Sequence, residues 1–283
     1  SFNSLISTTS LILFIFSDQM RYDVLSRTGN NTVKTPNLDK LASSGVYFNN
    51  AFTPTPVCVP ARISMITGKR GADTHYVTNY KIPGPVPELP TIMTLLQQAG
   101  YYTHGIGKTH FRGRHYGFMK METQEECPEY VIDDDYLMYL RDNGIRSRFL
   151  HGYRDLLYYQ PQTLSTPLEH SPNEWVADRT VKFLRDHVKY RKEEPFYLWS
   201  SYISPHPPFA ASEPYASMYN SEKMDMPYNT ERNISSLPYG AIPHRGRLDG
   251  AHKDPGRMKR IKALYYGMVS HVDACIGRTV AEL

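Results

Sequence analysis

The sequence predicts an α/β protein with a central, mostly parallel sheet, and three observations lead to this prediction. Residues 11–16 form a short and entirely apolar segment, as expected of a strand that is buried on both faces of a parallel sheet. Residues 101–106 and 196–203 also have the character of strands. Helical patterns separate these segments along the chain, and such alternation is typical of βαβ units.

The composition excludes several other classes of protein. Glycine and proline number 18 and 21 in 283 residues, close to their average abundance, so the chain is neither collagen-like nor of low complexity. The net charge of +4 comes from lysines and arginines spread along the chain, which argues against a nucleic-acid-binding protein. No apolar run approaches the roughly 18 residues of a membrane-spanning helix.

The cysteines and the N-terminus say little about the compartment. Cys58, Cys127 and Cys275 are too few and too far apart for a disulfide framework or a thiolate zinc site. No basic region precedes the first apolar segment, so no secretion signal is visible. The chain starts at Ser1, which is compatible with a signal that has been removed. The location is therefore open between the cytoplasm and a periplasmic or secreted state.

The first helix is predicted by its capping residues. Thr35 has the character of an N-cap and Pro36 suits the first helical position. The helix should continue to about Ser44 and stop at Gly45. Residues 46–51 then follow as a candidate second strand.

Helical patterns also cover three later segments of the chain. Residues 90–99 form an amphipathic pattern that stops at Gly100. Ser171 to Glu174 is a capping box that opens a helix reaching about Lys192. The last helical pattern covers residues 258–283. The irregular segments 119–167 and 210–255 are expected to be loops that cover the site.

Polar residues follow each of the three predicted strands. Asp18 and Gln19 follow the first strand, Lys108 and His110 the second, and His206 the third. The carboxyl ends of parallel strands meet at one edge of a sheet, and ligands bind there in open α/β sheets. We therefore expect these side chains to lie close together.

A fourth reactive position is Cys58, which lies at or just before a predicted helix over residues 61–67 that ends at Gly68. A helix N-terminus favours anions and lowers the pKa of a thiol. Arg62 lies one helical turn beyond Cys58, so its guanidinium can return to the thiol. Lys108 and His110 are two residues apart and would share a face of an extended segment.

These residues resemble the signature of the type I sulfatases of the alkaline phosphatase-like superfamily. Residues 58–62, Cys-Val-Pro-Ala-Arg, match the pattern C-x-P-x-R, in which the cysteine becomes Cα-formylglycine, and residues 63–70 resemble its continuation. Other blocks of the chain resemble the family in the same order. They are residues 16–19 with Arg21 and Asp23, residues 35–41 and 45–51, residues 107–110, residues 205–209 and residues 266–273.

The resemblance implies a fold and a set of roles. The fold would be the alkaline phosphatase-like three-layer sandwich, and residues 1–283 would be the N-terminal part of the sulfatase catalytic domain. Asp18, Gln19 and residue 58 as formylglycine would bind Ca²⁺ or Mg²⁺, which prefer oxygen ligands. The catalytic residues would be Cys58 as nucleophile, Arg62 and Lys108 on the sulfate, His110 as base and His206 on the leaving-group oxygen. The implied partners are a sulfated small molecule or sugar and the formylglycine-generating enzyme.

The sequence departs from the family pattern in two places. Many branches carry paired aspartates at the first metal position, whereas this chain has Asp18-Gln19, which resembles the branch with choline sulfatase-like enzymes and phosphonate monoester hydrolases. The family's second metal strand, a further lysine and the small C-terminal domain would follow Leu283, so the chain resembles a C-terminally truncated sulfatase.

Other functions stay open from the sequence. The same machinery could act on phosphonate or phosphate esters, as the Asp18-Gln19 pair suggests. The chain could also be a non-catalytic fragment without half of its metal site. A minor alternative is an unmodified cysteine hydrolase that uses Cys58 and His110. The sequence does not identify the alcohol or sugar of the substrate.

Overall fold

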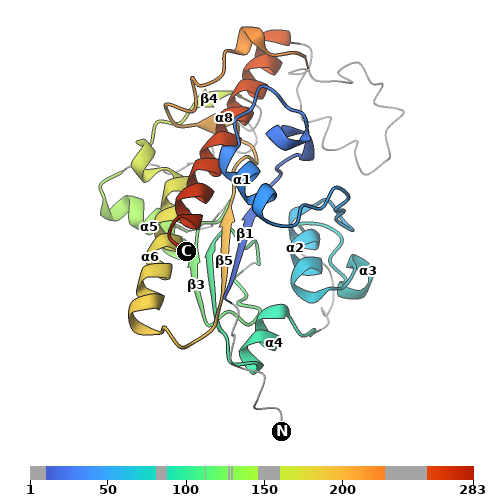
Figure 1. The fold of residues 1–283 in the computed structure, drawn as a ribbon, viewed down its shortest axis with the longest axis vertical. Helices are drawn as coiled ribbons and strands as arrows, with labels where there is room; N and C mark the ends of the chain where they lie inside the picture. Colours follow the sequence, from blue (N-terminus) through green and yellow to red (C-terminus); the bar gives the residue numbers. More distant parts are fainter. Residues whose placement is uncertain are drawn as a thin grey trace.

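A four-stranded parallel sheet lies at the centre of the molecule (Figure 1). The computed structural model describes residues 11–80, 88–111, 113–126, 128, 130–145, 160–226 and 254–283. Within them the strand order is β1-β5-β2-β3. This architecture confirms the predicted α/β fold. The strands are β1 (Ile12–Ser17), β2 (Tyr102–Gly107), β3 (Lys120–Thr123) and β5 (Phe196–Tyr202).

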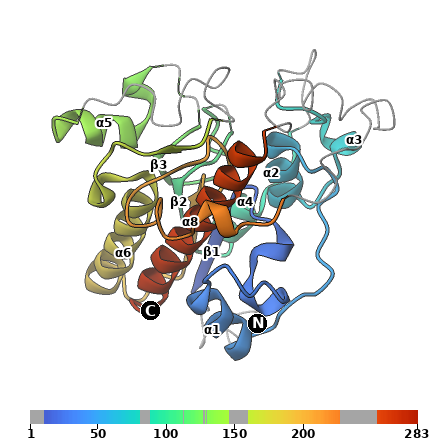
Figure 2. The ribbon, with the colours of Figure 1, turned by 90° about the horizontal axis from the view of Figure 1, so that it is seen from above.

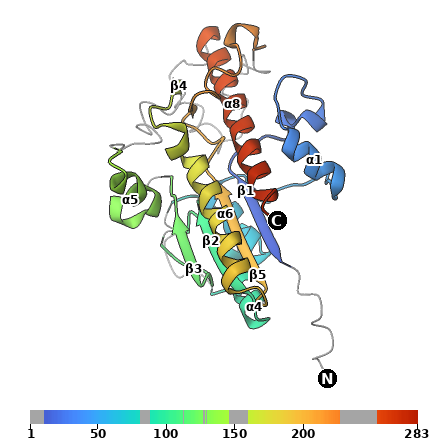
Figure 3. The same cartoon turned by 60° about the vertical axis from the view of Figure 1, so that its left-hand side comes forward.

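Helices cover both faces of this sheet. On one face, the strands pack against α6 (Pro172–Tyr190) and α8 (Pro255–Val280), which lie side by side in Figure 2. On the other face, they pack against α2 (Cys58–Thr67) and α4 (Ile92–Gln98). Because side chains alternate along a strand, Leu198 of β5 joins the first layer and its neighbour Trp199 the second. Figure 3 shows α6 lying along the sheet.

Helix α1 (Pro36–Ser44) has the predicted bounds, but another residue caps it. The Thr35 side chain makes no cap hydrogen bond and instead bonds to Ser26. Asp273 of α8 accepts hydrogen bonds from the backbone N–H groups of Asn37 and Leu38, at 3.2 and 2.8 Å. The long-range contact therefore satisfies the N-terminus of α1 and joins it to α8.

The predicted strand over residues 46–51 is wrong. These residues have no regular secondary structure, and no described strand pairs with them. Val46 and Phe48 are 81% and 74% exposed, so their apolar character does not reflect burial against the described part of the chain.

The sequence predicted an irregular segment over residues 119–167, but the structure shows regular elements within it. It contains β3, which lengthens the sheet, and α5 (Asp135–Asp142), whose Tyr136 and Leu140 join the core. β3 was missed because its four residues, Lys-Met-Glu-Thr, carry two charges and no apolar run. β4 (Gln162–Thr163) and β6 (Ala210–Ala211) form a separate parallel pair.

The remaining elements are short. Among the described helices, none combines the length and the apolar character needed to cross a membrane. The short elements are α3 (Gly71–Thr74) and the 3₁₀ helices η2 (Tyr22–Val24), η3 (Ser26–Thr28), η4 (Val131–Asp133), η5 (Leu168–His170) and η6 (Ser221–Lys223).

Candidate active site

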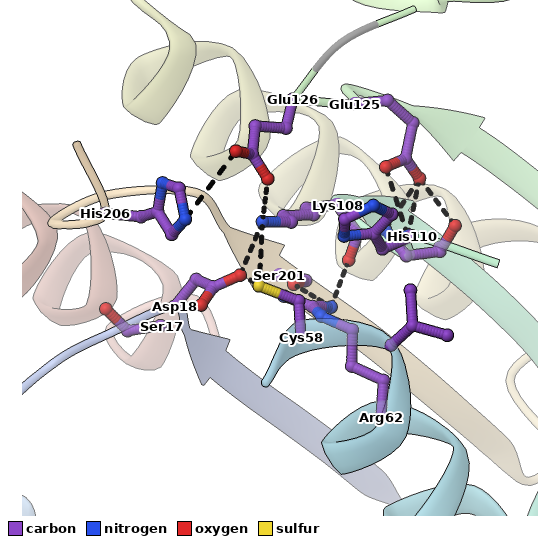
Figure 4. A network of polar contacts seen from close by, with 12 residues as sticks. Ser17, Asp18, Cys58, Arg62, Lys108, His110, Glu125, Glu126, Ser201 and His206 are labelled. Atoms are coloured by element: carbon purple, nitrogen blue, oxygen red, sulfur yellow. Dashed lines mark hydrogen bonds and ion pairs between the residues drawn. The ribbon is translucent and has the colours of Figure 1, made fainter. Parts of the chain in front are cut away.

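The carboxyl ends of three strands converge on one polar cluster (Figure 4). Asp18 follows β1, Lys108 follows β2 and His206 lies four residues beyond β5. The sheet hydrogen bonding continues to Asp18, whose N–H donates to Tyr202, and to Lys108, whose N–H donates to Ser201. The parallel register therefore places these side chains together, as predicted.

Lys108 lies between two buried carboxylates. Its Nζ is 2.6 Å from Asp18 Oδ2 and 2.7 Å from Glu126 Oε2, and the side chain is fully buried. Burial by itself would lower the pKa of Lys108, but the charges of Asp18 and Glu126 outweigh it and raise this pKa. Burial opposes ionisation of Asp18, yet Lys108 and Arg62 hold its pKa well below the ordinary value. Asp18 and Lys108 are therefore both charged at neutral pH, and Glu126 forms an ion pair with the same ammonium.

Arg62 comes from α2 and reaches the same carboxylate. Its Nη2 is 3.1 Å from Asp18 Oδ2, and its Nη1 donates to the Lys108 carbonyl at 2.7 Å and to Ser201 Oγ at 3.2 Å. The guanidinium also lies over the Phe16 ring, 4.6 Å from its centre. These contacts fix a positive charge one helical turn from Cys58.

Cys58 is the first residue of α2, so the helix begins three residues earlier than predicted. Its Sγ lies 3.9 Å from Lys108 Nζ. Burial raises the pKa of the Cys58 thiol, and this effect outweighs the opposing charges of Lys108 and Arg62. The thiol is therefore protonated at neutral pH, which does not favour an unmodified cysteine nucleophile.

Glu125 fixes the backbone around His110. Its carboxylate accepts hydrogen bonds from the Thr109 N–H at 2.9 Å, the Thr109 hydroxyl at 2.6 Å and the His110 N–H at 2.9 Å. The sequence predicted an extended segment over Lys108 and His110. The φ of +56° at His110 shows that the backbone bends there instead. The bend brings a ring nitrogen of His110 within 4.8 Å of Cys58 Sγ and a Glu126 oxygen.

The two histidines of the site are mostly uncharged near neutral pH. Burial and the charge of Lys108 lower the pKa of His110 to about 4. Burial and Lys108 also lower the pKa of His206. The His206 Nδ1 lies 2.6 Å from the Pro207 carbonyl, which makes Nδ1 the protonated nitrogen, and its Nε2 lies 3.6 Å from Glu126 Oε1.

Gln19 is placed differently from the other candidates. It has φ of +59° and its side chain is exposed. Its carbonyl accepts a hydrogen bond from the Tyr265 hydroxyl at 2.7 Å. Within the described residues, no hydrogen bond links the Gln19 side chain to the cluster. The structure thus brings Asp18, Cys58, Arg62, Lys108, His110 and His206 together, with Gln19 at the rim.

The sequence did not reveal Glu125, Glu126 and Ser201 as residues of this cluster. Ser201 lies inside a predicted strand, and the two glutamates lie in a segment predicted to be irregular. The adjacent acidic pair, one residue beyond the short polar strand β3, was the available signal in the sequence. Cys127 lies outside the described residues, and Cys275 is buried in α8, away from this site.

Two carboxylates of the cluster, Asp18 and Glu126, have the oxygen chemistry that a divalent cation prefers. The Lys108 ammonium occupies the space between Asp18 and Glu126, so a cation already neutralises these two carboxylates. Carboxylate oxygens are ligands that Ca²⁺ and Mg²⁺ prefer. Asp18 is ionised across the physiological range because of its lowered pKa, as a metal ligand must be.

Comparison with known sequences gives a consistent result. Residues 10–283 match the protein family described as Sulfatase. An arylsulfatase of Clostridium perfringens (strain 13 / Type A) is 30% identical over 304 residues, which cover 96% of this chain and 59% of the relative. The multifunctional alkaline phosphatase superfamily protein PehA of Trinickia caryophylli is 27% identical, with 98% of this chain and 60% of the relative covered. The chain thus spans less than two thirds of these curated relatives.

Solved structures share the fold over a similar part of their length. The phosphonate monoester hydrolase of Agrobacterium radiobacter superposes with a TM-score of 0.76 at 24% identity, covering 96% of this chain and 59% of that one. A 2-O GAG sulfatase superposes with a TM-score of 0.66 at 19% identity, covering 98% and 54%. At these identities the likeness concerns the fold.

Proposed function

Because the chain belongs to the sulfatase family of the alkaline phosphatase superfamily, we propose that it hydrolyses sulfate monoesters with residue 58, as formylglycine, providing the nucleophile. The observation that carries this proposal is the position of Cys58. It opens α2 at the carboxyl edge of the sheet, within 3.9 Å of the Lys108 ammonium and one turn from Arg62. A hydrated formylglycine would supply a geminal diol oxygen at that place.

Arg62 and Lys108 would neutralise the charge of the sulfuryl group. Both are buried and held by Asp18, so their charges are already oriented when the ester enters. Preorganised charge of this kind stabilises a transition state more than mobile charge in water does. A metal held by Asp18 and residue 58 would supply further positive charge to the sulfuryl oxygens, and Gln19 would join them once its side chain turned inward from the rim.

His110 and His206 are the candidates for proton transfer. His206 keeps one proton on Nδ1, so its Nε2 must first take up a proton from solvent before it can donate to the leaving-group oxygen. His110 is neutral near pH 7 because of its lowered pKa, so it can accept a proton near residue 58. The two rings would thus serve opposite ends of the reacting ester.

A phosphonate or phosphate ester is the second candidate substrate. The Asp18-Gln19 pair favours it, and a 27% identical relative is described as a multifunctional alkaline phosphatase superfamily protein. Turnover of an aryl sulfate and an aryl phosphonate by the same preparation decides between the two. A faster reaction with the phosphonate would reject the sulfate as preferred substrate.

Modification of Cys58 tests the proposal directly. When the chain is produced together with a formylglycine-generating enzyme, we expect the peptide containing Cys58 to lose about 18 Da as the thiol becomes an aldehyde. Cys127 and Cys275 lack the surrounding motif and serve as internal controls. An unchanged thiol at Cys58, with the modifying enzyme active on a control peptide, would reject the nucleophile.

A further inference from the structure

We propose that Glu126 makes this site prefer tetrahedral oxyanions with one negative charge over those with two. The inference rests on the proposed function in one respect, since it takes the cluster around Cys58 to be the place where an oxyanion group binds. It goes further by assigning a role to a residue outside the sulfatase motifs quoted above, and by naming the charge of the accepted group.

Glu126 reaches the cluster from the connection between β3 and α5. Its side chain is 3% exposed, its Oε2 lies 2.7 Å from Lys108 Nζ, and its Oε1 lies 3.6 Å from His206 Nε2. One of its oxygens is within 4.8 Å of Cys58 Sγ. A buried negative charge therefore lies next to the position at which an oxyanion must meet residue 58.

Among the described side chains of the cluster, and before any metal is counted, the charges balance because of Glu126. Arg62 and Lys108 provide two positive charges, and Asp18 and Glu126 provide two negative ones. Without Glu126 the same cluster would carry one surplus positive charge. At about 5 Å and in a partly buried environment, one extra unit charge changes a binding constant by about tenfold or more. The repulsion between the Glu126 carboxylate and a bound anion is about twice as large for a dianion as for a monoanion.

A structural role alone makes a different prediction. If Glu126 served only to hold Lys108 in place, its replacement would weaken binding of all oxyanions to a similar degree. If Glu126 acts through its charge, its replacement changes the ratio of the affinities for a dianion and a monoanion. The ratio is therefore the quantity to measure, and it does not depend on turnover.

The test uses inorganic sulfate and methyl sulfate, which across neutral pH are a dianion and a monoanion that share a tetrahedral sulfur with at least three terminal oxygens. Calorimetric titration of the full 283-residue chain gives the two dissociation constants for wild type, Glu126→Gln, Glu126→Asp and Glu169→Gln. Glu126→Asp keeps the charge, and Glu169→Gln removes one charge from the exposed surface. We expect Glu126→Gln to shift the ratio about tenfold in favour of sulfate, and the two other variants to keep the wild-type ratio.

An unchanged ratio in a folded Glu126→Gln variant would overturn the proposal, and so would a lack of binding of both anions to wild type and variant alike. If Glu126→Gln does not fold, wild type itself provides the measurement. Inorganic phosphate gains its second charge near neutral pH, so its affinity relative to sulfate should fall between pH ~6 and ~8. A constant relative affinity would overturn the preference.

The outcome is separable from that of the proposed function. If Glu126→Gln shifts the ratio of the two dissociation constants but no sulfate ester is hydrolysed, the role of Glu126 in selecting anions by charge stands and the sulfatase activity is rejected. Hydrolysis of an aryl sulfate, together with an unchanged ratio of the two dissociation constants in Glu126→Gln, would support the sulfatase activity and reject the role of Glu126.

Discussion

At the cluster, each charged side chain is held by others that come from distant parts of the chain. Asp18 contacts both Arg62 and Lys108, and Lys108 contacts Glu126. Removing one member of a buried ion pair leaves the other charge without compensation, which costs about 3–5 kcal/mol. Substitutions here should therefore affect both catalysis and stability, and each test of activity needs a test of folding.

Replacement of Cys58 or Arg62 should abolish activity. In a catalytic domain that also carries the remaining metal ligands of the family, we expect Cys58→Ala and Arg62→Ala each to reduce turnover of an aryl sulfate by ~100-fold or more, because they remove the nucleophile and a preorganised charge. Arg62→Lys is the matched control for charge without the planar guanidinium. Turnover near the wild-type value in either alanine variant, measured with the folded protein from co-expression with the modifying enzyme, would contradict the assigned roles.

Glu125 is expected to act as a positioning residue. Its carboxylate holds the Thr109 and His110 backbone, so Glu125→Ala should release the bend at His110 and lower kcat by ~10- to 100-fold with a smaller effect on KM. Glu125→Gln retains an acceptor oxygen and should recover part of the rate. Steady-state kinetics of both variants check this. Equal loss in kcat and affinity, without rescue by glutamine, would indicate a general structural defect.

At the scale of elements, α5 is tied to the active-site segment by Asp134. This residue caps α5 by accepting a hydrogen bond from the Leu137 N–H at 2.9 Å, and its second oxygen accepts from the Glu125 N–H at 2.6 Å. The capped helix therefore supports the glutamate that fixes His110. Hydrogen bonds thus connect the N-terminus of α5 through Asp134 to Glu125, and through Glu125 to the backbone at His110.

Asp134 should also make stability depend on pH. Burial raises its pKa to about 7 from an ordinary value of 3.8. The folded state then binds a proton that the unfolded state has lost, so this contribution to stability is present below pH ~4 and is lost as pH rises to ~7. The slope is at most ~1.4 kcal/mol per pH unit.

Urea unfolding between pH 4 and 8 tests this effect. We expect Asp134→Asn to flatten the decrease in the free energy of unfolding across that range, because the amide does not titrate. Asp142→Asn, on the exposed end of the same helix, is the control and should keep the wild-type slope. The same slope in Asp134→Asn and wild type would exclude Asp134 as its origin.

At the scale of the whole molecule, the described cluster offers few ligands to a metal. Ca²⁺ and Mg²⁺ take six or more oxygen ligands in most sites, and the described cluster brings in two carboxylates, Asp18 and Glu126, both engaged by Lys108. We therefore expect the 283-residue chain to bind Ca²⁺ only weakly, with a dissociation constant on the order of 1 mM or above. Its turnover should be correspondingly low.

Calorimetric titration with Ca²⁺ measures this affinity. Lys108→Met removes the competing ammonium and should strengthen binding, whereas Asp18→Asn should weaken it further. Micromolar binding by the wild-type chain would show that the site is complete within these residues, and the assignment of the remaining ligands to other parts of sulfatases would be wrong.

Several features were accessible from the sequence because they depend on neighbours along the chain. The bounds of α1 follow from Pro36 and Gly45, and β1 follows from an unbroken apolar run. The spacing of Cys58 and Arg62 is local as well. The convergence of Asp18, Lys108 and His206 was also predictable, because parallel strands bring their carboxyl ends to one edge.

The tertiary structure decided what depends on contacts between distant segments. Glu126 belongs to the cluster only because β3 joins the sheet beside β2, and the polar sequence of β3 does not indicate a strand. The expected strand at residues 46–51 did not form against the described residues, because an apolar sequence specifies burial and pairing only when a neighbour is present. Burial and ion pairs, which set the pKa values of Cys58 and His110, likewise arise only when the folded chain excludes water from the cluster.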